Sequence, residues 1–324
     1  MVVGDRRAGN EQAPVISVVI ETFTITREYP MAEAQAQLGS LLDRLREQSY
    51  PRDLTEIMVI LEGGSTELCQ FVGTRYPEVR TVFIRQGTYL SMKNLGFETA
   101  RGDMIALIDG DCLPIADWLT RIAAAYSDGA DVVAGKTRYR PEHPFAHTFS
   151  IFDFGHVQAD RDGKTFAFNV NNLAFRRSVV AKNRFDDRVR RNGGCFLFWR
   201  TLKLANYDMV YDPLMYAGHG NDFWKLGFVR KHVERGFDTI NLLRHTDPKL
   251  LESARYIRLG PLVPLGMLAS RVWFDLRRLV SNRGDLGIRP YALPYFYAVS
   301  VLVRSLEALG GMIAIWRPSH FHEH

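Results

Sequence analysis

Two carboxylates, Asp109 and Asp111, follow directly after the apolar run 104–108. In extended geometry, residues two positions apart point to the same side of the chain, and Gly110 between them lets a ligand approach the backbone closely. Two hard oxygen ligands on one side suit Mg²⁺ or Mn²⁺ carrying a diphosphate. The same three residues also fit a solvated turn after a strand, so the assignment depends on the elements around them.

The run 104–108 is apolar on both alternating faces, which is typical of a strand covered by helices on each side. The sequence predicts similar buried strands at 15–20, 57–61 and 80–84, and helices at 31–47, 66–76 and 91–99. This alternation predicts a parallel sheet with right-handed crossovers. Such sheets bind ligands beyond the carboxyl ends of their strands, where Thr22, Glu62, Asp109 and Asp111 all fall.

Several short motifs accompany this alternation. In chain order they are Ile16-Ser17-Val18-Val19-Ile20, Glu62-Gly63-Gly64-Ser65-Thr66, Lys93-Asn94-x-Gly96, Asp109-Gly110-Asp111, Asn172-x-Ala174-Phe175-Arg176-Arg177, and Tyr211-x-Pro213 leading to His219. Together they make the chain resemble the family-2 glycosyltransferases of GT-A fold over about residues 15–245. The family usually has Asp-Asp-Gly-Ser at the second motif and Arg-Asn-x-Gly at the third. The resemblance implies transfer of a sugar from a nucleotide-sugar donor.

The resemblance also implies which residues contact the donor. Thr22 and Glu62 would contact the nucleobase, and Lys93 and Asn94 would contact the ribose or the phosphates.

Asp109 and Asp111 would contact the ribose and the metal, with His219 as the third protein contact near the metal. Imidazole is an acceptable ligand of Mn²⁺, although an ordinary loop histidine is the alternative for His219. Lys231 and Arg235 lie on a basic stretch further on and would neutralise the leaving diphosphate. A solvated helix face is the alternative for this basic pair.

The catalytic base is where the sequence departs from the family pattern. Inverting members usually carry an acidic pair at the start of the helix that precedes the Tyr211-x-Pro213 strand, and its Asp removes the acceptor's proton. Here that helix begins near Gly193 and carries Cys195, without a carboxylate. We expect a packed, inert Cys195, although a thiol near a helix N-terminus can be acidified. The candidate bases are Asp187, Asp153 and Asp222, of which we favour Asp187 and Asp153.

Length and cysteine content limit the class of protein. The chain has 324 residues, enough for one large or two smaller domains. Its cysteines, Cys69, Cys112 and Cys195, are far apart and lack a metal-binding spacing. A disulfide framework is therefore not expected, and a reducing compartment is favoured. The polar segment before the first strand does not have the pattern of a secretory signal.

The net charge of +5 is unevenly distributed. Residues from Lys249 onward carry ten basic and five acidic side chains, whereas the first 248 residues carry equal numbers of each. We therefore expect an anionic partner for the C-terminal part. The rest of the chain lacks the basic patch of a nucleic-acid-binding protein, so nucleic acid is not an expected partner.

Two apolar stretches near the C-terminus have the pattern of amphipathic helices. The stretch 295–316 would span ~33 Å as a helix, long enough to cross a bilayer. However, Arg304 and Glu307 would each cost ~2.5–3.5 kcal/mol at the centre of a spanning helix. They share one stripe with Ser300 and Gly311. We expect this helix, and a similar one at 265–280, to lie at a membrane surface; a helical cap or a dimer interface is the alternative.

The sequence thus predicts an α/β fold of GT-A type, with a mostly parallel, Rossmann-like sheet flanked by helices. The predicted regions are a polar N-terminal segment (1–14), the glycosyltransferase domain (15–248) and an amphipathic helical region (249–324). The predicted activity is metal-dependent transfer of a sugar to a lipid-linked or cell-envelope glycan, by a protein bound peripherally to the cytoplasmic face of the plasma membrane. The alternatives are a nucleotidyl or sugar-phosphate transferase, or a non-catalytic nucleotide-sugar-binding scaffold. A second copy of the chain is a further candidate partner, in a homo-oligomer.

Overall fold

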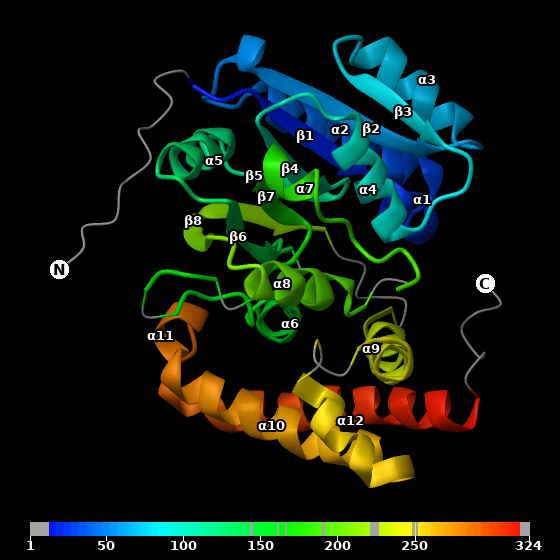
Figure 1. Cartoon of the computed structure of the whole chain (residues 1–324), viewed down its shortest axis with the longest axis vertical. Helices are drawn as coiled ribbons and strands as arrows, with labels where there is room; N and C mark the ends of the chain where they lie inside the picture. Colours follow the sequence, from blue (N-terminus) through cyan, green and yellow to red (C-terminus); the bar gives the residue numbers. More distant parts are fainter. Residues whose placement is uncertain are drawn as a thin grey trace. The chain divides into compact units, whose positions relative to one another are not determined.

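The computed structural model of the chain describes residues 13–142, 145–160, 162–165, 167–189, 192–220, 227–247, 250 and 252–317. The described residues form two compact units (Figure 1). The first unit takes residues up to Arg140, His156–Asp187 and Phe198–Gly220. The second takes Pro141–Gly155, Arg188–Leu197 and the chain beyond Gly220.

The first unit is built on an eight-stranded sheet with the order β3-β2-β1-β4-β7-β6-β8-β5. The strands are β1 (Ile16–Glu21), β2 (Thr55–Glu62), β3 (Arg80–Ile84), β4 (Met104–Asp109), β5 (Cys112–Pro114), β6 (Val132–Tyr139), β7 (Asn172–Arg176) and β8 (Met209–His219). Neighbours from β3 to β4 pair in parallel, as do β6 and β8. The short strand β5 is antiparallel to β8, and β7 is antiparallel to both β4 and β6. The sheet is therefore mixed, with a parallel half where the sequence predicts one.

Helices cover this sheet because its central strands are apolar on both faces. The helices of this unit are α1 (Phe23–Glu28), α2 (Met31–Arg46), α3 (Thr66–Arg75), α4 (Tyr89–Thr99), α5 (Trp118–Ser127) and α7 (Arg177–Val180), with a 3₁₀ turn at Arg52–Leu54. Helix α8 (Gly194–Leu204) belongs to this unit from Phe198 onward. On one face of β1, Ile16, Val18 and Ile20 enter a core shared with α2 and α5. On the other face, a Cβ added to Gly96 of α4 would lie 2.2 Å from Cγ1 of Val19. A residue without a side chain at position 96 thus lets α4 lie directly on β1.

The predicted elements of the parallel half are confirmed, and the differences lie at their ends. Helix α4 begins at Tyr89, two residues before the predicted start, because Thr88 and Ser91 form a capping box that holds the first turn. The sequence analysis did not predict the ten-residue helix α5, or the short elements α1, β5, β7 and α7. The short elements have between three and six residues each, so their hydrophobic period cannot be recognised.

The second unit is helical. It contains α6 (Ala146–Asp153), α9 (Gly227–His245), the 3₁₀ segment Glu252–Leu262, α10 (Val263–Ser281), α11 (Arg283–Leu286), the 3₁₀ turn Pro290–Ala292 and α12 (Leu293–Trp316). Helices α9 and α12 touch backbone to backbone. A Cβ at Gly310 would lie 1.8 Å from the carbonyl oxygen of Val233, and one at Gly236 would lie 1.7 Å from that of Glu307. Glycine at these positions is required by the close approach.

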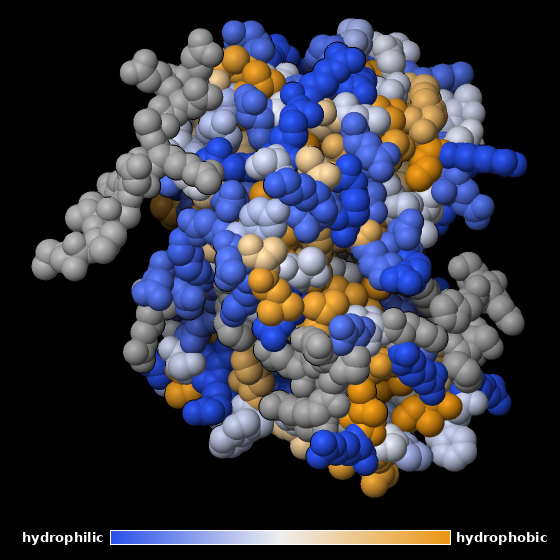
Figure 2. All heavy atoms as spheres, viewed as in Figure 1, coloured by the Kyte–Doolittle hydropathy of each residue, from blue (hydrophilic) through white to orange (hydrophobic). Residues whose placement is uncertain are grey.

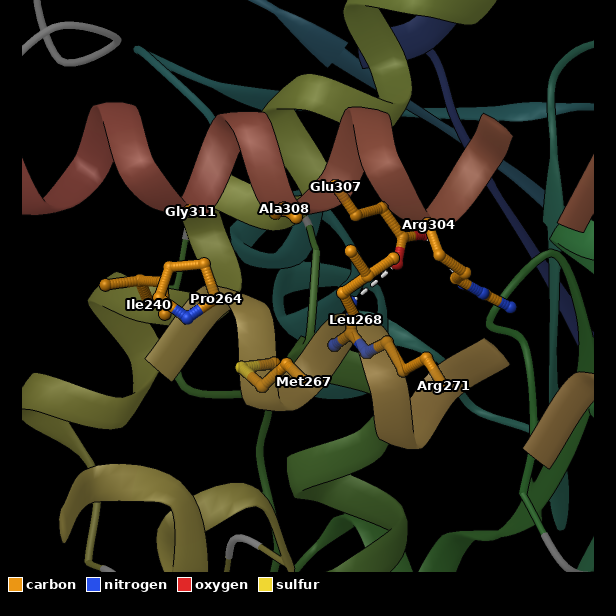
Figure 3. A pocket seen from close by; sticks show the side chains of 10 residues that line it. Ile240, Pro264, Met267, Leu268, Arg271, Arg304, Glu307, Ala308 and Gly311 are labelled. Carbon is orange, nitrogen blue, oxygen red and sulfur yellow. Dashed lines mark hydrogen bonds and ion pairs between the residues drawn. The ribbon is translucent and has the colours of Figure 1, made fainter. Parts of the chain in front are cut away.

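A network of charged side chains lies inside this unit, between α9, α10 and α12 (Figure 3). The Arg304 guanidinium donates to Asp275 at 2.8 Å and to Glu307 at 2.7 Å. Arg271 donates to the other oxygen of Glu307 at 2.6 Å, and the Ser300 hydroxyl donates to Asp275 at 2.9 Å. The arginine charges hold the pKa of Glu307 well below its ordinary value, although burial alone would raise it. The predicted polar stripe of α12 exists, and it faces the interior of the unit.

The outward face of these helices is apolar in many places. Exposed large hydrophobic residues include Trp273, Phe274 and Val280 on α10, and Val301, Leu302 and Leu309 on α12. Figure 2 shows hydrophobic side chains among charged ones on the described part of the C-terminal helices. Among the described residues, one helix, Pro290–Trp316, is long and apolar enough to cross a membrane by length and composition. The Arg304–Glu307 stripe is thus buried rather than solvent-facing, while several large apolar side chains of the same helices are exposed.

Candidate active site

Asp109, the last residue of β4, is held by two residues of α4. The Lys93 ammonium donates to Oδ1 of Asp109 at 2.6 Å, and the Tyr89 hydroxyl donates to Oδ2 at 2.9 Å. Side-chain exposure is only 1% for Lys93 and 2% for Asp109. Burial by itself would raise the pKa of the Asp109 carboxyl, but the charge of Lys93 holds it below its ordinary value. Asp109 is therefore an ionised carboxylate whose two oxygens already have protein donors.

Asp111 lies two residues on, in the turn between β4 and β5. The Tyr29 hydroxyl donates to its Oδ2 at 3.2 Å, and Nδ1 of His219 lies 3.4 Å from the same oxygen. Its backbone carbonyl accepts from the Gly220 N–H at 2.9 Å, which ties the turn to the end of β8. Burial and the Asp111 charge raise the pKa of the Tyr29 hydroxyl, so that this group remains a donor.

The end of β8 brings the imidazole of His219 to the turn that carries Asp111. Cys112 of β5 pairs directly with His219 of β8. One ligand atom each from Asp111, Cys112 and His219 lies within 4.8 Å of the others, and all three residues are buried. A carboxylate, a thiol and an imidazole at this separation fit a divalent cation. Of the three residues predicted as metal ligands, the structure brings Asp111 and His219 together, while Asp109 is bound by Lys93.

Cys112 was not among the predicted metal ligands. Along the chain the cysteines lack a metal-binding spacing, and Cys112 has no nearby histidine. The antiparallel pairing of β5 with β8 makes the neighbour, and β5 was too short to be predicted. The sequence feature that could have indicated Cys112 as a ligand is its position directly after Asp111.

The residues predicted to contact the nucleobase lie at the ends of β1 and β2. The Thr22 hydroxyl donates to the Ile60 carbonyl at 2.8 Å, so it fastens the end of β1 to β2. The Glu62 carboxylate accepts from Arg27 at 2.9 Å and from the Gly87 N–H at 3.2 Å. The Arg27 guanidinium also lies 3.9 Å from the ring centroid of Phe23. Glu62 thus lies among a cation, an aromatic ring and a backbone donor, at the sheet edge where ligands bind.

Asn94 has a different environment. Its side chain donates to the Phe185 carbonyl at 2.9 Å and accepts from the Phe185 N–H at 3.0 Å. Both ends of the amide are used to hold this loop, which continues to Asp187. Asp187 itself is exposed.

The other predicted site residues belong to the second unit. The Asp153 carboxylate has a side-chain exposure of 0% and accepts from Lys231 at 3.0 Å and from Arg235 at 2.9 Å. His232 is also buried, and its Nε2 lies 3.7 Å from Asp153. Burial lowers the pKa of the His232 imidazole below its ordinary value. Asp222, the remaining candidate base, lies outside the described residues.

The sequence of this chain is similar to those of known glycosyltransferases. Residues 30–185 match the model of glycosyl transferase family 2. Glycosyltransferase AglE of Haloferax volcanii is 28% identical over 132 residues, which are 39% of this chain and 40% of that protein. The match thus spans well under half of the curated relative.

Solved structures with the same arrangement include several glycosyltransferases. A mannosyltransferase from Pyrobaculum calidifontis, solved with GDP-Man and Mn²⁺, matches over 96% of this chain and 89% of its own, with a TM-score of 0.59 at 16% identity. GalNAc-T7, solved with UDP, GalNAc and Mn²⁺, matches over 66% of this chain and 45% of its own, with a TM-score of 0.53 at 12% identity. At these identities the likeness shows the fold, which is GT-A. The sequence match over residues 30–185 and the GT-A fold together support a family-2 glycosyltransferase.

Proposed function

We propose that this protein transfers a sugar from a nucleotide-sugar donor to an acceptor, with a divalent cation bound at Asp111 and His219. The observation that carries the proposal is that Asp111 and His219 come within 3.4 Å of each other, directly after the carboxyl end of β4 and at the carboxyl end of β8. Ligands of open α/β sheets bind at such ends. When bound there, Mn²⁺ or Mg²⁺ would neutralise the charge that develops on the leaving diphosphate.

The protein's own residues have distinct tasks in this proposal. Asp109 stays ionised on Lys93, so it can accept a hydrogen bond from a ribose hydroxyl while Lys93 adds positive charge beneath the site. Glu62 would contact the nucleobase by accepting from a ring N–H while Arg27 balances its charge. Thr22 is buried and would act by fastening the end of β1 to β2. Asn94 acts through the Phe185 loop as a positioning residue.

For the catalytic base we propose Asp187. Its exposed carboxylate lies in the chain just ahead of α8, close to where the family carries its acidic pair. A base must be reachable by the acceptor hydroxyl. Asp153 meets this requirement poorly, because its side chain is inaccessible and its oxygens are held by Lys231 and Arg235. For the same reason, Lys231 and Arg235 could serve a leaving diphosphate only by sharing or releasing Asp153.

We place the acceptor on a lipid or a cell-envelope glycan, at the cytoplasmic face of a membrane that the protein binds peripherally. The support is the outward apolar side chains of α10 and α12, together with exposed Arg277 and Arg289. Arg277 lies 5.7 Å from the Trp273 ring, and Arg289 donates to the Tyr291 hydroxyl at 2.9 Å. Aromatic rings beside arginines are typical of helices at a membrane interface.

The decisive experiment is a donor screen. Purified full-length protein is incubated with a panel of nucleotide-sugars and Mn²⁺, with and without lipid vesicles, and the released nucleotide product is identified. We expect a free nucleoside diphosphate. Pyrophosphate would instead indicate a nucleotidyl transferase, and donor binding without any turnover would indicate a nucleotide-sugar-binding scaffold.

The metal assignment is tested separately with Asp111→Asn. This variant keeps the side-chain shape and removes the charge that a divalent ion needs. Binding of a nucleoside diphosphate, measured by calorimetry, should lose its dependence on Mn²⁺. Unchanged metal dependence in Asp111→Asn would place the metal elsewhere.

The base assignment is tested by comparing three variants. Asp187→Asn should lose the ~10²–10⁴-fold that general-base catalysis supplies, while its donor binding remains. Cys195→Ala should keep most of the activity. If Asp153→Asn loses turnover with intact folding while Asp187→Asn does not, the base lies in the second unit.

A further inference from the structure

Cys112 lies beside the two residues that we propose as metal ligands. Because Cys112 and His219 are direct partners in an antiparallel pair, their side chains leave the sheet on the same side. Asp111 lies in the turn before β5, so strand alternation does not determine on which side of the sheet its side chain lies. The bond from the Gly220 N–H to the Asp111 carbonyl brings this turn to the residue after His219. The three ligand atoms lie within 4.8 Å of one another for this reason.

We propose that Cys112 is a direct metal ligand, and that the site therefore prefers Zn²⁺ and other thiolate-binding cations to Mg²⁺ or Mn²⁺. The inference rests on the proposed metal site. Cysteine, histidine and a carboxylate form the ligand set that Zn²⁺ prefers, whereas Mg²⁺ and Mn²⁺ favour oxygen ligands. Asp109, which would otherwise supply the third ligand, has both oxygens on Lys93 and Tyr89.

Chemically, binding converts the Cys112 thiol to a thiolate and releases one proton to solvent. The thiolate charge then adds to that of Asp111, so a divalent ion leaves the three-residue site electrically neutral. Zn²⁺ held by Asp111, Cys112 and His219 would have room for one further ligand. An oxygen of the donor diphosphate is a chemically suitable occupant of that position.

The test uses Co²⁺ in place of Zn²⁺, because a cobalt–thiolate bond produces a near-ultraviolet charge-transfer band that oxygen and nitrogen ligands do not. Metal-free full-length protein is titrated with Co²⁺, and then with Zn²⁺ in competition. We expect the band in the wild type and its loss on adding Zn²⁺. The matched control is the double variant Cys69→Ser/Cys195→Ser, which removes the other two cysteines and should keep the band.

Cys112→Ser should lose the band. Its Zn²⁺ affinity should fall by more than the roughly 10–100-fold that loss of an outer-shell partner costs, while its Mn²⁺ affinity stays near that of the wild type. Cys112→Ala, compared by circular dichroism and thermal melting, provides a second variant in case the hydroxyl disturbs the core around position 112. The band should also weaken in Asp111→Asn and in His219→Ala.

The outcomes separate this inference from the proposed function. If Co²⁺ binds in an Asp111-dependent way without a charge-transfer band, or if the band survives in Cys112→Ser, Cys112 is not a ligand and the metal site stands. If metal binding is absent in the wild type, or is unchanged in Asp111→Asn and His219→Ala, the metal site itself is refuted and the inference falls with it.

Discussion

Individual side chains in this protein are fixed by pairing before any ligand arrives. Lys93 and Asp109 show this most clearly, since neither has solvent to stabilise its charge. Removing one partner of such a pair leaves a buried, unbalanced charge, which is far more costly than the pair itself is stabilising. The first aspartate of the Asp109-Gly110-Asp111 motif is thus part of the sheet's internal electrostatics as well as a candidate ligand contact.

This pairing can be measured with Lys93→Met. The variant should lose about 3–5 kcal/mol of unfolding free energy in urea at neutral pH. The double variant Lys93→Met/Asp109→Asn should regain a large part of that loss, because the carboxylate charge is gone. If the double variant loses as much unfolding free energy as Lys93→Met and Asp109→Asn lose together, Lys93 and Asp109 do not interact as described.

A second residue-scale prediction concerns acid. The folded-state pKa of His232 is below its ordinary value, so the unfolded state binds the proton more readily. Stability from this group is present above about pH 6.5 and is lost as the pH falls through that value. The groups near the ring are Asp153, Glu307 and Arg235. Thermal melting between about pH 5 and 8 should show this decline, and His232→Gln should flatten it.

Glu307 affects the pH dependence of stability at lower pH than His232 does. Its folded-state pKa is depressed, so its stabilisation is complete above its ordinary pKa and is lost as the pH falls further. In His232→Gln the decline should therefore begin only near the ordinary carboxyl pKa. An unaltered decline between about pH 5 and 7 in His232→Gln would assign that decline to another group.

At the scale of elements, helix contacts in the second unit depend on two glycines. Gly310→Ala should destabilise the unit by at least the ~1–3 kcal/mol typical of overpacking, since its Cβ would meet the Val233 carbonyl of α9. Gly284→Ala on α11 is the matched control, because nothing lies within 4 Å of the added atom. Denaturant unfolding of both variants checks this. Equal stability would mean that α9 and α12 are further apart than described.

Some elements of the fold were predictable from the sequence alone, and others depend on tertiary contacts. Buried strands such as β1 and β4 are apolar on both faces, so their pattern alone predicted them and the parallel half of the sheet. The polar stripe of α12 was likewise visible in the spacing of Arg304 and Glu307. The sequence did not show that this stripe faces inward, because its partners, such as Asp275 of α10, come next to it only through tertiary packing. Cys112 was missed for the same reason, since its neighbour His219 is defined by strand pairing.

At the scale of the whole molecule, the outward apolar residues of α10 and α12 are the expected membrane contact. Trp273→Ser combined with Leu302→Ser should reduce co-sedimentation with anionic vesicles, because it removes two exposed anchors and leaves the buried network intact. Donor-nucleotide binding should be unchanged. As a control, Phe83→Ser removes an exposed hydrophobic residue of β3 and should leave vesicle binding at the wild-type level. Vesicle binding that survives the double variant would contradict this assignment.

The inward-facing charges of α12 also bear on how the chain is made. On the ribosome, α9 and α10 emerge before α12, and segments fold from the N-terminus onward as they appear. Asp275 and Arg271 are therefore already present when Arg304 and Glu307 leave the exit tunnel. The most apolar helix of the described chain can then satisfy its charges with partners made earlier. Removal of α10 would take away Asp275 and Arg271, and the Arg304–Glu307 pair of α12 would lose its partners on that helix.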